Sequence, residues 1–204
     1  MPLDQTLKDL REGNSKTIWL AHEKISNSDV SAIAKELEKN TSVESIRLDG
    51  TNISGAGVRE IVSALANNTA MESLSFDYCA NIGDAGASAI ASLLNKNNPP
   101  LTGLFLNLAN IGVEGAKAIA SALEKNYFLS KLWMGQNNIT SVGARHFAEA
   151  LENNSSLRSI ALNESNIDTI GAQAIAAMLE KNIALTSINV DWNPAIGYEG
   201  GKAI

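Results

Sequence analysis

Apolar and polar positions recur in the same order about every 28 residues along this chain. In the unit 101–128, Leu104 and Leu106 stand two positions apart, a period that predicts a short strand with one buried face. After a turn, apolar residues spaced three and four apart predict a helix with one buried face; they are Ala116, Ile119, Ala120 and Leu123. Each unit is therefore expected to contain one strand, one turn and one helix.

The other units repeat these apolar columns in register. An isoleucine follows the strand at Ile25, Ile53, Ile82, Ile111, Ile139, Ile167 and Ile196. A leucine stands late in the helix at Leu37, Leu65, Leu94, Leu123, Leu151 and Leu179. A fixed period of this length indicates a solenoid, in which each unit covers the apolar face of its neighbour. Because a helix separates successive strands, the strands must be parallel and the crossovers right-handed.

Strands pack about 4.8 Å apart and helices about 8 to 10 Å apart, so the stack is expected to curve with the sheet on the inside. The predicted fold class is α/β: a right-handed βα solenoid, or horseshoe, with a concave parallel sheet and convex helices.

Polar columns accompany the apolar ones. Small, mostly polar residues that can satisfy the backbone of a turn stand after each strand, at Thr51, Cys79, Ala109, Asn137, Ser165 and Asn193. An asparagine closes each helix, at Asn40, Asn68, Asn97, Asn126, Asn154 and Asn182. Asparagine tolerates the left-handed conformation of a helix C-terminal cap, and we expect that role here.

These columns carry a family resemblance. The pattern Leu129-x-x-Leu132-x-Met134-x-x-Asn137-x-Ile139 resembles the core of the leucine-rich repeat, and most units continue with Gly-x-x-x-Ile-x-x-x-Leu. The 28-residue helical form is similar to the ribonuclease-inhibitor-like subclass, over roughly residues 15–204. That subclass and its relatives include ribonuclease inhibitor, the Ran GTPase-activating protein, NOD-like receptor sensor regions, the tropomodulin C-terminal domain and some bacterial effectors. The resemblance implies a fold, whereas function varies freely among its members.

The two ends of the chain depart from the repeat. Leu3, Leu7 and Leu10 predict a short helix that covers the first unit, so residues 1–14 are assigned to an N-terminal helical cap. Residues 15–204 are assigned to a leucine-rich repeat domain of about seven units, the last incomplete. We expect the natural chain to continue past Ile204; otherwise this end pairs weakly with another copy, and the protein is a monomer or a weak dimer.

A row of side chains is expected to project from the concave face, at Trp19, Arg47, Ser75, Phe105, Trp133, Ala161 and Asn189. A second row, starting at Ala21, is expected to run beside the first. A third row, starting at His22, lies at the strand exits and places Trp192 at the rim of the sheet. Exposed aromatic residues in a concave site are typical of binding hot spots. Phe105 and Trp133 lie on adjacent strands, roughly 5 Å apart at the backbone, and can form one patch. The alternative is that these aromatic residues only cover the sheet.

Carboxylates make the same face mildly acidic, although such charges often only solvate a surface. We therefore predict a protein partner with basic and apolar groups, held in the arc. The candidate partner-binding residues are Trp19, Arg47, Asp49, Asp77, Tyr78, Phe105, Asn107, Trp133, Glu164, Asp191 and Trp192.

Composition narrows the partners further. The net charge of −6 and a pI near 5.0 argue against binding to nucleic acid, which needs clustered Lys and Arg. No apolar run reaches the roughly 18 to 20 residues of a membrane span. The single cysteine, Cys79, excludes an internal disulfide and fits a reducing compartment. We expect a cytoplasmic protein, delivered into a host cell if it is a bacterial effector.

No catalytic constellation is visible in the sequence. His22, His146 and Cys79 fall in three different units and make no metal set or catalytic triad. We therefore expect no metal, no cofactor and no enzymatic activity. One alternative is a GTPase-activating protein on the same scaffold, for which Arg47 is the only arginine in the central concave row. Another is the repeat part of a larger bacterial effector or sensor.

Overall fold

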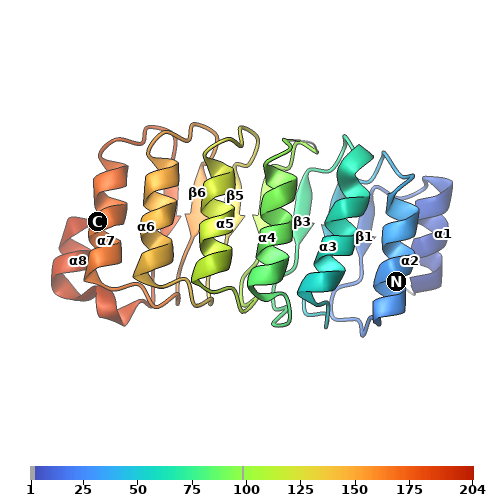
Figure 1. Cartoon of the computed structure of the whole chain (residues 1–204), viewed down its shortest axis with the longest axis horizontal. Helices are drawn as coiled ribbons and strands as arrows, with labels where there is room; N and C mark the ends of the chain where they lie inside the picture. The colour runs from blue at the N-terminus through green and yellow to red at the C-terminus, as the bar shows by residue number, and fades with distance from the viewer. Residues whose placement is uncertain (1–2, 98) are drawn as a thin grey trace.

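The computed structural model describes residues 3–97 and 99–204 (Figure 1). Met1 and Pro2, which belong to the predicted cap, lie outside the described residues, as does Asn98. Within the described part, each repeat contributes one strand and one helix, as its hydrophobic pattern predicts.

Seven strands of the described chain form one sheet in sequence order, and each pairs in parallel with the next. The strands are β1 (Thr17–Trp19), β2 (Ser45–Arg47), β3 (Ser73–Ser75), β4 (Gly103–Phe105), β5 (Lys131–Trp133), β6 (Ser159–Ala161) and β7 (Ser187–Asn189).

The helices form a single layer over one face of the sheet (Figure 1). They are α1 (Leu3–Glu12), α2 (Asn27–Leu37), α3 (Gly55–Ala64), α4 (Gly83–Leu94), α5 (Val113–Leu123), α6 (Thr140–Leu151), α7 (Thr169–Leu179) and α8 (Gly197–Ala203), with short 3-10 turns η1 (Leu65–Asn67) and η2 (Pro194–Ile196). The fold is a right-handed βα solenoid, as the repeat predicts. Its other face, which we call the open sheet face, carries no helices.

The core lies between the sheet and the helix layer. One residue of each strand points into it, and from β1 to β6 these residues are at most 1% exposed: Ile18, Ile46, Leu74, Leu104, Leu132 and Ile160. The glycine near the start of each helix from α3 to α8 is explained by close packing. A Cβ on Gly115 would lie 2.7 Å from Cγ2 of Ile111 and 2.9 Å from Cβ of Ala87, too close for any side chain.

Helix α1 packs on the first repeat. Leu10 is buried, and Leu3 and Leu7 pack against the core. Arg11 also forms an ion pair with Glu36 of α2, with 2.7 Å between Nη2 and Oε1. The helix therefore covers the apolar end of the solenoid, while the division of the chain at residue 14 stays a prediction.

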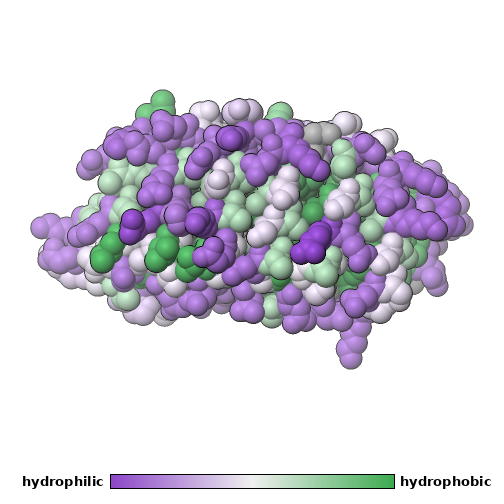
Figure 2. Space-filling view, in the orientation of Figure 1, coloured by the Kyte–Doolittle hydropathy of each residue, from purple (hydrophilic) through white to green (hydrophobic). Residues whose placement is uncertain are grey.

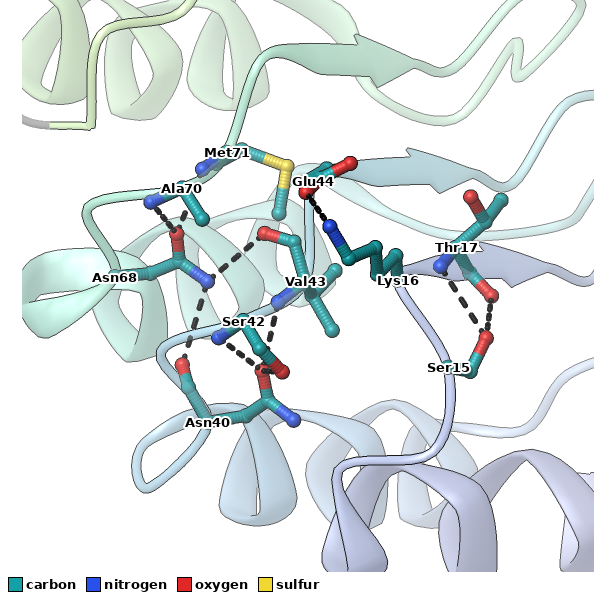
Figure 3. A network of polar contacts seen from close by, with 10 residues as sticks. All are labelled: Ser15, Lys16, Thr17, Asn40, Ser42, Val43, Glu44, Asn68, Ala70 and Met71. Atoms are coloured by element: carbon teal, nitrogen blue, oxygen red, sulfur yellow. Dashed lines mark hydrogen bonds and ion pairs between the residues drawn. The ribbon is translucent and has the colours of Figure 1, made fainter.

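The asparagines that close the helices act through their side chains (Figure 3). Nδ2 of Asn68 donates to the carbonyl oxygens of Asn40 (3.3 Å) and Val43 (3.1 Å) in the preceding repeat. Its Oδ1 accepts from the backbone N–H groups of Ala70 (2.8 Å) and Met71 (2.7 Å). The expected left-handed cap is wrong for Asn68, whose φ is −80°.

Of the six closing asparagines, all within the described residues, only Asn97 has a positive φ. In the other five, one amide donates to the preceding repeat (for Asn40, to helix α1) and accepts from its own turn, which explains why the column is asparagine. This satisfies backbone groups that burial removes from water.

None of the helices in residues 3–97 and 99–204 has both the length and the apolar character needed to cross a membrane.

Candidate functional site

The strand register aligns the predicted row across the open sheet face. Trp19 pairs with Arg47, Arg47 with Ser75, and Ser75 with Phe105. The row continues through Trp133, Ala161 and Asn189. This arrangement confirms the register predicted from the sequence. Trp19 and Trp133 are 54% and 41% exposed, so core packing does not account for them, whereas Ser75 is buried, contrary to expectation.

Phe105 and Trp133 form the expected aromatic pair. Their ring centroids are 5.0 Å apart and their planes meet at 87°, an edge-to-face geometry. A Cβ on Gly103 would lie 3.2 Å from Cε2 of Phe105, so the absence of a side chain at Gly103 makes room for the ring. The strand register thus places the two rings next to each other, and Gly103 leaves the space that the Phe105 ring occupies.

At the N-terminal end of the face, Arg47 is held by two partners. Its guanidinium lies 4.8 Å from the ring centroid of Trp19, within cation–π range. Nε also donates to Oδ2 of Asp49 at 3.1 Å, and Nη2 lies 3.0 Å from the same oxygen in an ion pair. These contacts fix Arg47 against the sheet, in contrast to the free arginine that insertion into a phosphoryl-transfer site needs.

The second row of the face is a ladder of side chain to backbone hydrogen bonds. Oδ1 of Asp49 accepts from the N–H of Asp77 at 3.2 Å and from the hydroxyl of Ser75. Oδ1 of Asp77 accepts from the N–H of Asn107 at 2.7 Å. Oδ1 of Asn107 accepts from the N–H of Gly135 at 2.8 Å. Each side chain therefore pairs a backbone donor of the next repeat, just where the strand ends.

This ladder corrects the prediction for Asp49. The sequence suggested an exposed carboxylate available to a partner, but Asp49 is 5% exposed and both of its oxygens accept hydrogen bonds inside the protein. The sequence did not reveal this because the groups that consume the carboxylate come from the same strand and from the next repeat. Asp49 supports the face and does not present a charge to a partner.

Asp77 is half-buried. Burial raises the pKa of its carboxyl, the hydrogen bond from the backbone of Asn107 opposes the rise, and the neighbouring Asp49 carboxylate adds to it. Glu164 and Asp191 are exposed, so among the predicted carboxylates they are the most accessible charges on the face.

The third row adopts a left-handed backbone. The φ values are +63° at His22, +61° at Tyr78, +52° at Leu108, +57° at Gln136, +52° at Glu164 and +56° at Trp192, with +65° at Gly50. Only Gly50 is the residue type that this conformation favours. The turn directs the chain away from each strand, and it leaves Tyr78 56% and Trp192 80% exposed.

A hollow of about 280 Å³ opens beside Trp133 on the open sheet face. Three predicted residues meet there: Tyr78, Asn107 and Trp133. Four residues that were not predicted complete its lining: Gln136, Ala161, Asn163 and Asn189. The repeat pattern could have indicated them, since they occupy the same three rows in neighbouring repeats. They were not chosen as contact residues because they are neither aromatic nor charged.

The other predicted residues do not join this hollow. Trp19, Arg47 and Asp49 lie on or beside the first two strands, and Trp192 lines a separate apolar hollow of about 590 Å³ with Val190 and Ile196. The face therefore presents aromatic side chains along its whole length, and beside Trp133 it has a hollow that is open to solvent.

The fold and this face define a class: repeat solenoids that present an open parallel sheet. The sequence pattern described as "Leucine Rich repeat" matches residues 67–91, 97–120, 153–176 and 181–204. The chain is a leucine-rich repeat protein. The ribonuclease-inhibitor-like subclass stays a prediction.

Solved structures support the fold. The actin-binding site 2 of leiomodin-1 is 17% identical, with 90% of each chain covered and a TM-score of 0.52. The tropomodulin C-terminal domain of Caenorhabditis elegans is 15% identical, with 89% of this chain and 93% of that chain covered and a TM-score of 0.56. A comparison with curated protein sequences finds no match. At these identities the likeness concerns the fold alone.

Proposed function

We propose that this chain is a protein-binding module whose partner contacts the open sheet face. The observation that carries the proposal is the Phe105–Trp133 pair, a fixed edge-to-face contact in which Trp133 remains 41% exposed. An aromatic pair that is already packed together, with one ring exposed, loses little side-chain entropy on binding, as hot-spot residues do. The printed name of the leiomodin-1 domain describes binding to a protein, actin, on a similar fold.

The proposed contact residues extend along the face on both sides of this pair. They are Trp19, Arg47, Asp77, Tyr78, Phe105, Asn107, Trp133, Glu164, Asp191 and Trp192. The exposed carboxylates and the net charge of −6 favour a partner that offers basic as well as apolar groups. The helix face, on the opposite side, is mainly hydrophilic with small separate hydrophobic patches (Figure 2).

The proposed setting is a reducing compartment such as the cytoplasm, because the single cysteine cannot form an internal disulfide. The module acts by binding and not by catalysis. It is proposed to act as a monomer, or as a weak dimer through its C-terminal end.

A quantitative pull-down tests the proposal. Wild-type protein, the double variant Phe105→Ala/Trp133→Ala and the control Val142→Ala/Ile170→Ala are used as baits in the same lysate. Val142 and Ile170 are 49% and 61% exposed in helices α6 and α7, so the control removes comparable exposed apolar groups from the other layer. The proposal predicts that the first variant alone loses the captured protein. Equal capture by all three baits would contradict it.

A further inference from the structure

We propose that the hollow beside Trp133 receives the side chain of an arginine from the partner. The inference rests on the proposed function, because it names the group that a protein partner inserts into the open sheet face. It differs from that function in committing to one hollow, one residue type and one charge.

The size of the hollow favours a single side chain. Its volume of about 280 Å³ lies below the roughly 300 to 1,000 Å³ of clefts that enclose small-molecule ligands. Ala161 forms part of its lining between Trp133 and Asn189, which stand on the strands to either side. The indole of Trp133 is therefore separated from Asn189 by two strand spacings, roughly 10 Å, and only the methyl group of Ala161 stands between them.

The aromatic groups favour a planar cation. Trp133 contributes its indole and Tyr78 its phenol to the lining. A guanidinium stacks on such rings, and Arg is the most frequent partner of Trp in cation–π contacts. The face already contains this interaction once, between Arg47 and Trp19 at 4.8 Å. Trp133 has no arginine on its row neighbours, which are Phe105 and Ala161.

The amides of the hollow leave acceptors for the guanidinium donors. Nε2 of Gln136 donates to the carboxylate of Glu164 at 3.2 and 3.3 Å, so the carbonyl oxygen of Gln136 is the end that can accept. Among the described residues, the amide of Asn163 and the hydroxyl of Tyr78 make no hydrogen bond. These groups can therefore meet an inserted donor without breaking a bond of the protein.

The charge around the hollow selects a cation over a neutral or anionic group. Glu164 is bonded to Gln136, so its carboxylate adjoins the lining. Asp191 is exposed two residues after Asn189, and its backbone N–H is bonded to Oδ1 of Asn189 at 2.8 Å. Asp77 bonds the backbone of Asn107 on the other side. The lining contains no Lys, Arg or His among the described residues. Lys131 stands on the same face but at the opposite end of its strand, two residues before Trp133.

The test observes Trp133 directly. The chain has three tryptophans, so Trp19→Phe/Trp192→Phe leaves Trp133 as the only one, and its indole N–H gives one NMR signal. The probe is the blocked tripeptide acetyl-Gly-Arg-Gly-amide. Citrulline replaces arginine in a neutral control of the same shape, and methyl glucoside serves as a neutral sugar. The titration is repeated on wild-type protein, in which the three indole signals are assigned from the tryptophan variants.

We expect the arginine peptide alone to shift the Trp133 signal saturably. Glu164→Gln and Asp191→Asn should each weaken this binding about two- to fivefold, the effect of one exposed charge pair. The matched control Glu124→Gln, at the exposed C-terminal end of helix α5, should leave it unchanged. Salt at about 0.5 M should weaken binding to the wild type.

Three results would overturn the inference: no saturable shift with the arginine peptide, equal binding of the citrulline peptide or the sugar, or equal effects of Glu164→Gln and Glu124→Gln. The pull-down distinguishes a failure of the proposed function from a failure of the arginine site. If Phe105→Ala/Trp133→Ala captures the partner as the wild type does, the function is wrong even where arginine binds. If that variant loses the partner while arginine leaves Trp133 unshifted, only the arginine site is wrong.

Discussion

The side chain of Asn107 accepts a hydrogen bond from the backbone N–H of Gly135 in the next repeat, at 2.8 Å. Asn107 also lines the hollow beside Trp133. One residue therefore belongs both to the contacts that join repeats and to the surface proposed to bind a partner. The hydrogen bonds of Asp49, Asp77 and Asn107 across neighbouring strands restrain this part of the open sheet face.

The first prediction follows from this bond. Asn107→Ala removes the acceptor and leaves the N–H of Gly135, which is buried, without a partner. We expect a loss of about 1–3 kcal/mol in the free energy of unfolding, measured with urea. Asn107→Asp keeps an oxygen in the same place and should lose clearly less. Equal losses in the two variants would show that the hydrogen bond is not the cause.

Close packing between helices gives the second prediction. Gly115→Ala places a methyl group 2.9 Å from Cβ of Ala87 and 2.6 Å from Oδ1 of Asp84, which itself accepts from the N–H of Gly115. Overpacking of this kind costs about 1–3 kcal/mol, so the thermal midpoint should fall. Gly201→Ala, where nothing lies within 4 Å of the added methyl group, is the control and should not lower it. A midpoint for Gly115→Ala as high as that of the control would refute the packing account.

The left-handed row gives the third prediction. Leu108 holds φ at +52° although a Cβ disfavours this conformation, and its side chain is 38% exposed. Leu108→Gly should raise the free energy of unfolding by about 0.5–1 kcal/mol, the relief of strain less the backbone entropy of glycine. Leu108→Ala keeps the Cβ and should gain nothing. If the alanine variant is as stable as the glycine variant, strain at this position is absent.

The fourth prediction concerns pH. Because burial raises the pKa of Asp77 in the folded protein, the native state takes up this proton before the unfolded state does. The carboxyl therefore favours folding at low pH, and that contribution is lost as the pH rises through the raised pKa. Asp77→Asn keeps an oxygen for the N–H of Asn107 and removes the buried charge.

We expect Asp77→Asn to be more stable than the wild type at pH 7, with the difference shrinking as the pH falls through the raised pKa of Asp77 and vanishing below the ordinary value of 3.8. Urea unfolding at several pH values measures it. A difference that stays constant with pH, or a variant that is less stable at pH 7, would contradict the assigned cause.

Much of the fold was predictable because it depends on local spacing. The alternation around Leu104 and Leu106 and the helical spacing after Gly115 recur in every unit, so they predict the strand register and hence the row from Trp19 to Asn189. The edge-to-face contact of Phe105 with Trp133 follows from that register together with Gly103.

The polar contacts were less predictable because they form between repeats. Asn68 was expected to adopt a left-handed cap, but its amide bridges to Asn40 and Val43, which lie a full repeat earlier. The sequence suggested that Asp49 is a surface charge, yet its Oδ1 accepts from Ser75 and Asp77 of the next repeat and its Oδ2 accepts from Arg47. Residue type alone does not say whether a side chain meets water or the next repeat.

Site-specific photo-crosslinking tests the central claim, that the partner lies on the open sheet face, most directly. A photoreactive phenylalanine derivative is placed at Gln136, which lines the hollow beside Trp133, in one protein and at Ile170, on helix α7, in another, and each is irradiated in the same lysate. The account predicts that the protein lost by the Phe105→Ala/Trp133→Ala bait is crosslinked from position 136 and not from position 170. Crosslinking of that protein from position 170 alone would contradict it.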